Sequence, residues 1–150
     1  MTNKDRFIKA VKALIERYDS ENVAEIKKMG DGSVCPLCEA VFRIHRKVNN
    51  ECCPCPMAKK SAFANANKKL KRRAYPQCAE HFDSESARTI EYSLWSIKEQ
   101  IIQAGHWRAA AFREVLKCIE NWPKSRFTLR GWYEVDWDYI DGRELLEAGK

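Results

Sequence analysis

The sequence predicts a mainly α-helical protein, a single domain over residues 1–150 with a small irregular or β insertion clamped by metal. Apolar residues recur at three- and four-residue steps near the N-terminus and again in the second half of the chain, which is the helical period. Six of the seven cysteines fall in the insertion, residues 33–81. Five Trp and six Phe are enough for a core, so we expect the metal to fix one region of a helical protein that packs by itself.

The first predicted helix covers residues 5–18. Its apolar face consists of Phe7, Ile8, Val11, Leu14, Ile15 and Tyr18. Thr2 or Asn3 precedes this stretch and is a candidate N-cap, because both side chains accept hydrogen bonds from the first turn of a helix. Residues 23–29 continue a weaker helical pattern, which the turn residues 30–32 end before the first cysteine pair.

Two Cys-x-x-Cys pairs, Cys35/Cys38 and Cys52/Cys55, predict a metal site. Zinc takes four thiolates in a tetrahedron at about 2.3 Å, and each pair delivers two of them from one turn. The loop between the pairs is slightly shorter than the usual window for four-cysteine sites. These four cysteines make the simplest site. Three further residues compete for it: Cys53 could replace Cys52, and Cys78 or His81 could replace a member of the second pair or belong to another site.

Two other uses of the cysteines stay open. Disulfides are disfavoured by the odd cysteine count, by the Cys-x-x-Cys spacing, and by an N-terminus without a signal-like apolar run, which leads us to expect a reducing cytoplasm. An iron–sulfur cluster also accepts four thiolates, and Cys55-Pro56 fits some cluster motifs. We expect Cys118 to be a small buried hydrophobe, and His45 and His106 to stay away from the metal.

Positive charge is concentrated in the cysteine-rich region. Residues 31–81 carry ten Lys and Arg against four Asp and Glu, whereas residues 131–150 carry two against six. The densest run supplies the candidate nucleic-acid contacts, namely Lys68, Lys69, Lys71, Arg72 and Arg73. On a helix these cations would share a face and neutralise phosphates; the alternative is a solvated loop that keeps the protein soluble.

The second half of the chain predicts two consecutive helices and a strand. The first helix begins at a cap on Asp83 or Ser84 and ends near Gly105; the second covers residues 106–121 and stops before Pro123. Residues 132–140 then alternate aromatic and acidic side chains, which is typical of a short C-terminal strand. A helix needs about 20 consecutive apolar residues to span a bilayer, and no stretch of this chain approaches that length, so no membrane partner is expected.

The chain lacks the common catalytic signatures, including a phosphate-binding glycine loop, Gly-x-Ser-x-Gly and His-Glu-x-x-His. A deaminase would need a His-x-Glu ahead of its cysteines, and a site closed by four thiolates does not activate water. The sequence therefore favours a protein that is not an enzyme.

Five features follow one another along the chain: Cys35-Pro-Leu-Cys38, Cys52-x-x-Cys55-Pro56, Cys78, the Ala-rich stretch from Ala109, and Arg126-Phe-Thr-x-x-Gly131-Trp132. In this order the chain resembles a group of small cysteine-rich bacteriophage proteins. The resemblance covers roughly residues 35–132, and the Cys52-Cys53 doublet departs from it. It implies a phage origin and a metal site, and no reaction.

Our leading hypothesis is a non-catalytic zinc-binding protein in the host cytoplasm, whose basic insertion binds nucleic acid or a host complex that handles it. One alternative is an inhibitor of a host defence or transcription enzyme, acting through protein contacts of the acidic, aromatic segment 132–147. The other is an iron–sulfur or redox protein.

Overall fold

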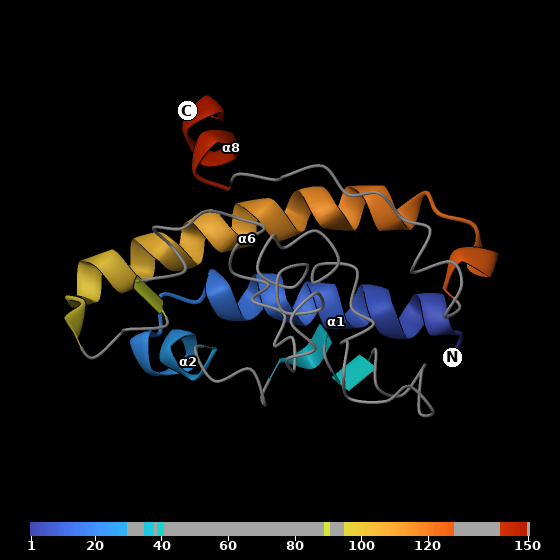
Figure 1. Ribbon diagram of the computed structural model, residues 1–150, viewed down its shortest axis with the longest axis horizontal. Helices are drawn as coiled ribbons and strands as arrows, with labels where there is room; N and C mark the ends of the chain where they lie inside the picture. The colour runs from blue at the N-terminus through green and yellow to red at the C-terminus, as the bar shows by residue number, and fades with distance from the viewer. Residues whose placement is uncertain (30–34, 38, 41–88, 91–94, 128–141, 150) are drawn as a thin grey trace, which may run out of the picture.

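The computed structural model describes residues 1–29, 35–37, 39–40, 89–90, 95–127 and 142–149 (Figure 1). Its elements are α1 (Asn3–Tyr18), α2 (Val23–Lys28), α6 (Lys98–Glu120), the 3-10 helix η5 (Lys124–Arg126) and α8 (Gly142–Ala148). These residues are mostly helical and contain no strand, so the mainly α prediction is confirmed for them. The strand predicted over residues 132–140 lies outside the described residues.

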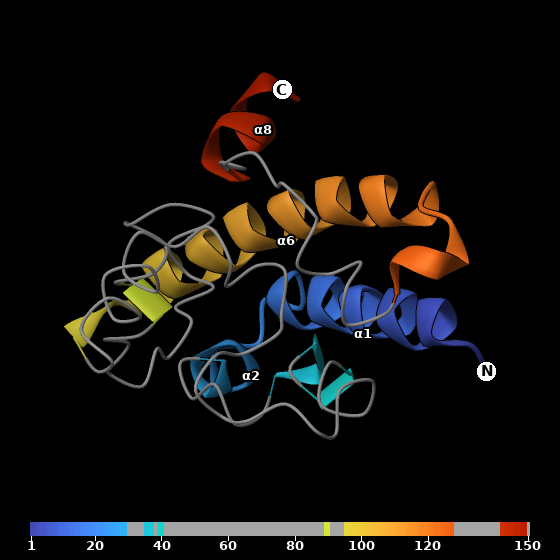
Figure 2. The same ribbon diagram turned by 45° about the vertical axis from the view of Figure 1, so that its right-hand side comes forward.

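Helices α1 and α6 form the centre of the molecule and run antiparallel, side by side (Figures 1 and 2). Helix α2 packs against both of them near the end of α1, and α8 lies on the side of α6 that faces away from α1 (Figure 2). Helix α6 is therefore the element that α1, α2 and α8 all contact.

Helix α1 begins two residues before the predicted start, and Thr2, one of the two candidate caps, is its N-cap. The Thr2 hydroxyl accepts a hydrogen bond from the Asp5 amide at 3.1 Å, and the Asp5 carboxylate accepts one from the Thr2 amide at 2.9 Å. This reciprocal capping box satisfies backbone donors that a helix start leaves open. Asn3, the other candidate cap, is the first residue of the helix. Helix α2 is capped by Asn22, whose side chain accepts a hydrogen bond from the Glu25 amide at 3.3 Å.

The core lies between α1 and α6. Its members on these helices and beside them include Phe7, Val11, Leu14, Tyr18, Ile26, Ile101, Phe112, Val115, Ile119 and Phe127. The apolar face predicted for the first helix is confirmed, except that Ile8 and Ile15 are only partly buried. Tyr18 stacks nearly parallel on Phe112, with ring centroids 5.9 Å apart, and the buried guanidinium of Arg108 lies 5.6 Å from the Tyr18 ring. Aromatic pairing of this kind adds to the area that the rings bury.

The two helices predicted to meet at Gly105 are one continuous helix, so that prediction is wrong. Gly105 does not end a helix; it allows close contact with α1, because a Cβ atom there would lie 2.4 Å from the Tyr18 carbonyl oxygen. The first of the predicted helices also does not run through residues 95–97: α6 begins after Ile97, whose amide donates to the Gln100 side chain at 3.1 Å. The predicted stop before Pro123 is confirmed, with Asn121 as the C-cap.

The start of α1 is tied to the end of α6. The Lys4 ammonium donates to the carbonyl oxygens of Glu120 at 2.8 Å and Trp122 at 3.0 Å, which are among the acceptors that a helix C-terminus leaves open. A cation at this end also interacts favourably with the helix dipole. Phe127, beyond η5, packs on the Phe7 ring at 5.9 Å, so this end of the helix pair is closed by both polar and apolar contacts.

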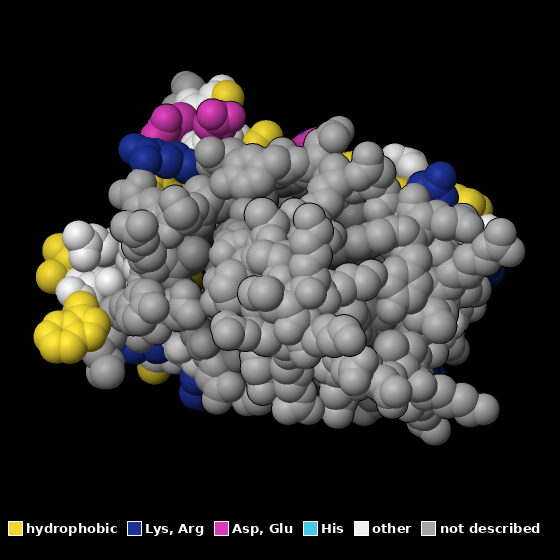
Figure 3. Space-filling model, viewed as in Figure 1, with side chains coloured by type: hydrophobic (Ala, Val, Ile, Leu, Met, Phe, Trp, Pro, Cys, Tyr) yellow, Lys and Arg dark blue, Asp and Glu magenta, His cyan; other side chains and the backbone are white. Residues whose placement is uncertain are grey.

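Helix α8 was not predicted from the sequence. It contacts α6 through Gly142, where a Cβ atom would lie 1.7 Å from the Trp107 carbonyl oxygen. The guanidinium of Arg143 lies 5.2 Å from the Trp107 ring centroid. The rest of α8 is largely exposed, and acidic and basic side chains stand close together on it (Figure 3).

Candidate functional site

Of the five proposed metal ligands, only Cys35 belongs to the described residues. Cys38, Cys52, Cys55 and Cys78 lie outside them, as do the proposed nucleic-acid contacts Lys68, Lys69, Lys71, Arg72 and Arg73. The described residues therefore leave the proposed ligand set and the proposed nucleic-acid contacts as predictions.

The beginning of the first cysteine pair is attached to the helical core. Cys35 is half-buried and packs against the core, and its carbonyl oxygen accepts a hydrogen bond from the Glu39 amide at 3.2 Å. This is the spacing of a helical turn. Leu37 and Ala40 on the same segment are buried, with 1% and 7% of their surface exposed. The segment that carries the first proposed ligand is thereby held on the core by its own apolar side chains.

The prediction that Cys118 is a buried hydrophobe is wrong, because its side chain is exposed. The buried stripe of α6 passes through Phe112, Val115 and Ile119. Cys118 precedes Ile119 by one residue, which turns it about 100° away from that stripe. The prediction was based on the apolar residues next to Cys118 in the sequence, and these do not show on which side of the helix it lies.

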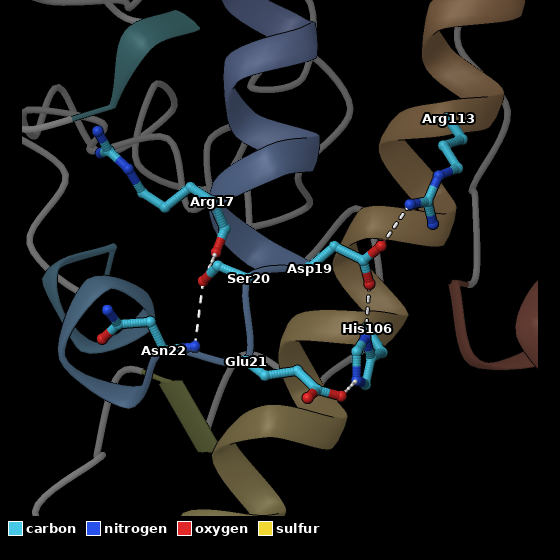
Figure 4. Close-up of polar contacts among 7 residues, drawn as sticks. All are labelled: Arg17, Asp19, Ser20, Glu21, Asn22, His106 and Arg113. Atoms are coloured by element: carbon cyan, nitrogen blue, oxygen red, sulfur yellow. Dashed lines mark hydrogen bonds and ion pairs between the residues drawn. The ribbon is translucent and has the colours of Figure 1, made fainter.

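The best-defined polar arrangement in the described residues is a group of four side chains that we call the His106 cluster: Asp19, Glu21, His106 and Arg113. His106 Nδ1 lies 2.6 Å from an Asp19 carboxylate oxygen, and Nε2 lies 3.1 Å from a Glu21 carboxylate oxygen (Figure 4). The Arg113 guanidinium donates to the other Asp19 oxygen at 2.5 Å. The cluster joins the turn after α1 to the face of α6.

Local structure explains why these four residues meet. Asp19 is the C-cap of α1, and its amide donates to the Ile15 carbonyl oxygen at 3.0 Å. Glu21 has a positive φ of 58°, and no other described non-glycine residue does, so its backbone takes a left-handed conformation that such residues rarely adopt. His106 and Arg113 are seven residues apart on α6 and therefore lie on one face, two turns from each other.

Asp19 is the electrostatic centre of the cluster. Burial alone would raise the pKa of its carboxyl, but hydrogen bonds from Arg113 and His106, together with their positive charge, outweigh burial and lower the pKa. Asp19 is thus held ionised between two donors. The side chains of Asp19 and His106 are 34% and 26% exposed, whereas that of Glu21 is 66% exposed, so water reaches the Glu21 end most easily.

The geometry of the cluster does not converge on a single ion. The two ring nitrogens of His106 face two different carboxylates, on opposite sides of the ring. Among the described residues, no group of three His, Cys, Asp or Glu side chains is arranged to hold a metal. What the arrangement does is cross-link the α1–α2 turn to α6.

Nothing in the sequence pointed to this cluster. Asp19 and His106 are 87 residues apart, and each occurs in an unremarkable local context. Only the antiparallel packing of α1 on α6 brings the end of one helix against the first half of the other.

An exposed apolar surface lies at the start of α6. Trp95 and Ile97, directly before α6, are 87% and 60% exposed. Hydrophobic side chains are visible at the end of the molecule where α6 begins (Figure 3).

Among the described helices, none combines the length and the apolar character that crossing a bilayer requires.

Comparison of the chain with protein-family models, with curated proteins and with solved structures gives no match.

Proposed function

We propose that this chain is a non-catalytic zinc-binding protein of a bacteriophage, whose basic cysteine-rich insertion binds nucleic acid or a host complex that handles it. The observation that carries the proposal is the anchoring of Cys35. A metal site that includes Cys35 would fasten the insertion to the helical core. The resemblance to cysteine-rich phage proteins supports the origin and the metal.

Zinc suits the residues available for this site. Its ligands would be drawn from Cys35, Cys38, Cys52, Cys55 and Cys78, all of them thiolates when metal is bound. Because the metal binds thiolates that the unfolded chain holds far apart, its binding free energy becomes folding free energy for the insertion. The zinc would thus order residues 33–81 without taking part in chemistry.

The metal content of the purified protein tests the first half of this proposal. We expect about one zinc per chain and no visible absorption band. Cys35→Ser should lose most of the metal, whereas Cys118→Ser, which changes an exposed cysteine on α6, should retain it. Full zinc in Cys35→Ser would contradict the ligand assignment, and iron with a band near about 400 nm would favour the iron–sulfur alternative.

Binding to nucleic acid tests the second half. The expected affinity is independent of sequence and falls steeply with salt, because each neutralised phosphate releases counterions. Replacing Lys68, Lys69, Lys71, Arg72 and Arg73 by Gln should reduce both the affinity and its salt dependence.

A matched control removes the same charge elsewhere. The control uses five exposed lysines of the described helices, namely Lys9, Lys12, Lys27, Lys98 and Lys124. Their replacement by Gln gives the same change in net charge. This control should bind more tightly than the variant of the basic run. Equal affinities would mean that net charge alone drives binding, and unchanged affinity in the basic-run variant would refute the assignment of these residues.

A further inference from the structure

The hydrogen bonds of His106 depend on its protons. Both ring nitrogens face carboxylate oxygens, and an ionised carboxylate accepts hydrogen bonds but donates none. A neutral imidazole carries one N–H, whereas the doubly protonated ring carries two. Both contacts of His106 are therefore hydrogen bonds only while the ring holds two protons.

The two contacts differ in strength. The Nδ1 contact with Asp19 is the shorter, at 2.6 Å, and Asp19 is fixed from its other side by Arg113. The Nε2 contact with Glu21 is 3.1 Å long, and Glu21 is the most exposed member of the cluster. When the ring loses one proton to water, we expect the proton on Nε2 to leave, which places a lone pair opposite the Glu21 carboxylate.

Release from His106 would also relieve backbone strain at Glu21. Its positive φ is unfavourable for a side chain with a Cβ atom and persists only while other contacts hold it. The His106 contact is one such restraint. Other restraints in this turn are the hydrogen bonds from the Ser20 hydroxyl to the Arg17 carbonyl, at 2.7 Å, and from the Asn22 amide to the Ser20 hydroxyl, at 3.2 Å (Figure 4). The Ser20 amide also donates to the Arg17 carbonyl, at 3.4 Å.

The other charged groups around the turn are engaged elsewhere. The Arg17 side chain extends away from His106 and approaches Glu25 of α2 at 3.8 Å, while Lys28 pairs with the same carboxylate at 3.1 Å (Figure 4). On α6, the residues one turn from His106 on either side are Ile102, Gln103, Ala109 and Ala110, none of them charged. On α8, Arg143 lies over the Trp107 ring. Among the residues that the structure describes, Asp19, Glu21 and Arg113 are thus the charged groups of the His106 cluster that surround the ring.

We propose that the His106 cluster is a proton-dependent latch. It holds the α1–α2 turn against α6 while His106 carries two protons, and it releases Glu21 when the ring loses one. Asp19 and Arg113 keep the end of α1 in place in both states, so only the segment from Glu21 into α2 loosens. This inference does not depend on the proposed zinc or nucleic-acid binding.

The direction of the pH effect follows from the proton count. The latched turn binds one proton more than the released turn, so rising pH favours release and falling pH favours the latch.

The test follows the backbone amide signals of residues 20–26 and the ring signals of His106 by NMR, from about pH 5 to about pH 9. In the unchanged protein, we expect the amides to move in one step together with the ring. His106→Gln should abolish that step, while His45→Gln, a change of a histidine that is not a candidate metal ligand, should leave it intact.

Glu21→Gln provides a second test of the latch, which can be used if His106→Gln fails to fold. A Gln amide can accept from a protonated nitrogen or donate to an unprotonated one, so the ring should still titrate while the step in the turn amides shrinks severalfold. Glu25→Gln, which changes a carboxylate of α2 paired with Arg17 and Lys28, should leave the step unchanged. Turn amides that stay still while the ring titrates, or a step of full size in Glu21→Gln, would overturn the proposal.

Discussion

Gly105 marks the closest approach of α6 to the end of α1. Its missing side chain lets the Tyr18 carbonyl oxygen and the Ile26 side chain pack directly on the α6 backbone. The same contact brings His106, the next residue, within reach of Asp19 and Glu21. One small residue thus determines the geometry of the polar cluster beside it.

Gly105→Ala should destabilise the protein by about 1–3 kcal/mol, because the new methyl group would lie 2.4 Å from backbone and must push the helices apart. This loss exceeds the gain of up to about 1 kcal/mol that alanine brings to a helix interior. Urea unfolding followed by circular dichroism measures the difference. Gly149→Ala is the control, because its nearest atoms would lie at an ordinary 3.6 Å. Equal stability of Gly105→Ala and the unchanged protein would show that the helices do not meet as described.

The carboxyl of Asp19 makes the stability of the folded protein depend on pH in the acid range. The pKa of its carboxyl is lowered in the folded protein, because the hydrogen bonds from Arg113 and His106 outweigh burial. The unfolded chain therefore takes up the proton first, and the stability that Asp19 contributes is present above about pH 4 and is lost as the pH falls further.

Asp19→Asn should cost about 1 kcal/mol near neutral pH, a modest amount because the pair is partly exposed to solvent. The difference from the unchanged protein should shrink below about pH 4. Denaturant unfolding at several pH values measures both. Glu114→Gln, which removes a surface pair with Lys117 on the same helix, should change stability by at most about 0.5 kcal/mol at any pH. A constant deficit in Asp19→Asn down to about pH 2 would argue against the lowered pKa.

At the scale of elements, local signals predicted helix ends well and helix junctions poorly. The start of α1 follows from a capping residue with Asp5 three positions on, and the end of α6 follows from Pro123; both are short-range effects that a sequence displays. The continuity of α6 through Gly105 was missed because glycine usually ends a helix, and here packing against Tyr18 uses it inside one. Tertiary contact, which no local pattern shows, decided that case.

Helix α8 is a second case. Its seven residues are too few to be stable alone, and its position depends on Gly142 against the Trp107 carbonyl and on Arg143 over the Trp107 ring. Sequence analysis grouped these residues with an acidic segment because the partner, on α6, lies about 35 residues away along the chain.

Gly142→Ala should detach α8 from α6 without unfolding the central pair. A Cβ atom 1.7 Å from the Trp107 carbonyl oxygen cannot be accommodated by small shifts, so the short helix must move away. Hydrogen exchange should show lost protection at residues 145–148 and nearly unchanged protection in α1, which is the pattern of local unfolding. Gly149→Ala again serves as the control. Unchanged protection of α8 in Gly142→Ala would contradict the docking contact.

At the scale of the whole molecule, the sequence indicated two regions with different sources of stability, and the described residues bear on one of them. The helical region buries its own core between α1 and α6, as the apolar periodicity predicted. The ligand set of the insertion stays a prediction, since thiolate spacing alone leaves Cys52, Cys53 and Cys78 as competing choices. Leu37 and Ala40 are where the described structure links the two regions.

This division predicts the result of removing metal. A zinc chelator should loosen residues 33–81 and lower the thermal stability, because the segment loses the binding free energy of the metal. It would keep the contribution of buried apolar side chains such as Leu37, which is worth about 1.5–3 kcal/mol. The helical signal of α1 and α6 and the amide protection of Val11 and Ile119 should persist, since these residues are buried by contacts between the helices. Circular dichroism and hydrogen exchange, with and without chelator, separate the two regions. Complete unfolding on chelation would mean that the helices do not form a stable core by themselves, and that the metal organises the whole molecule instead of one insertion.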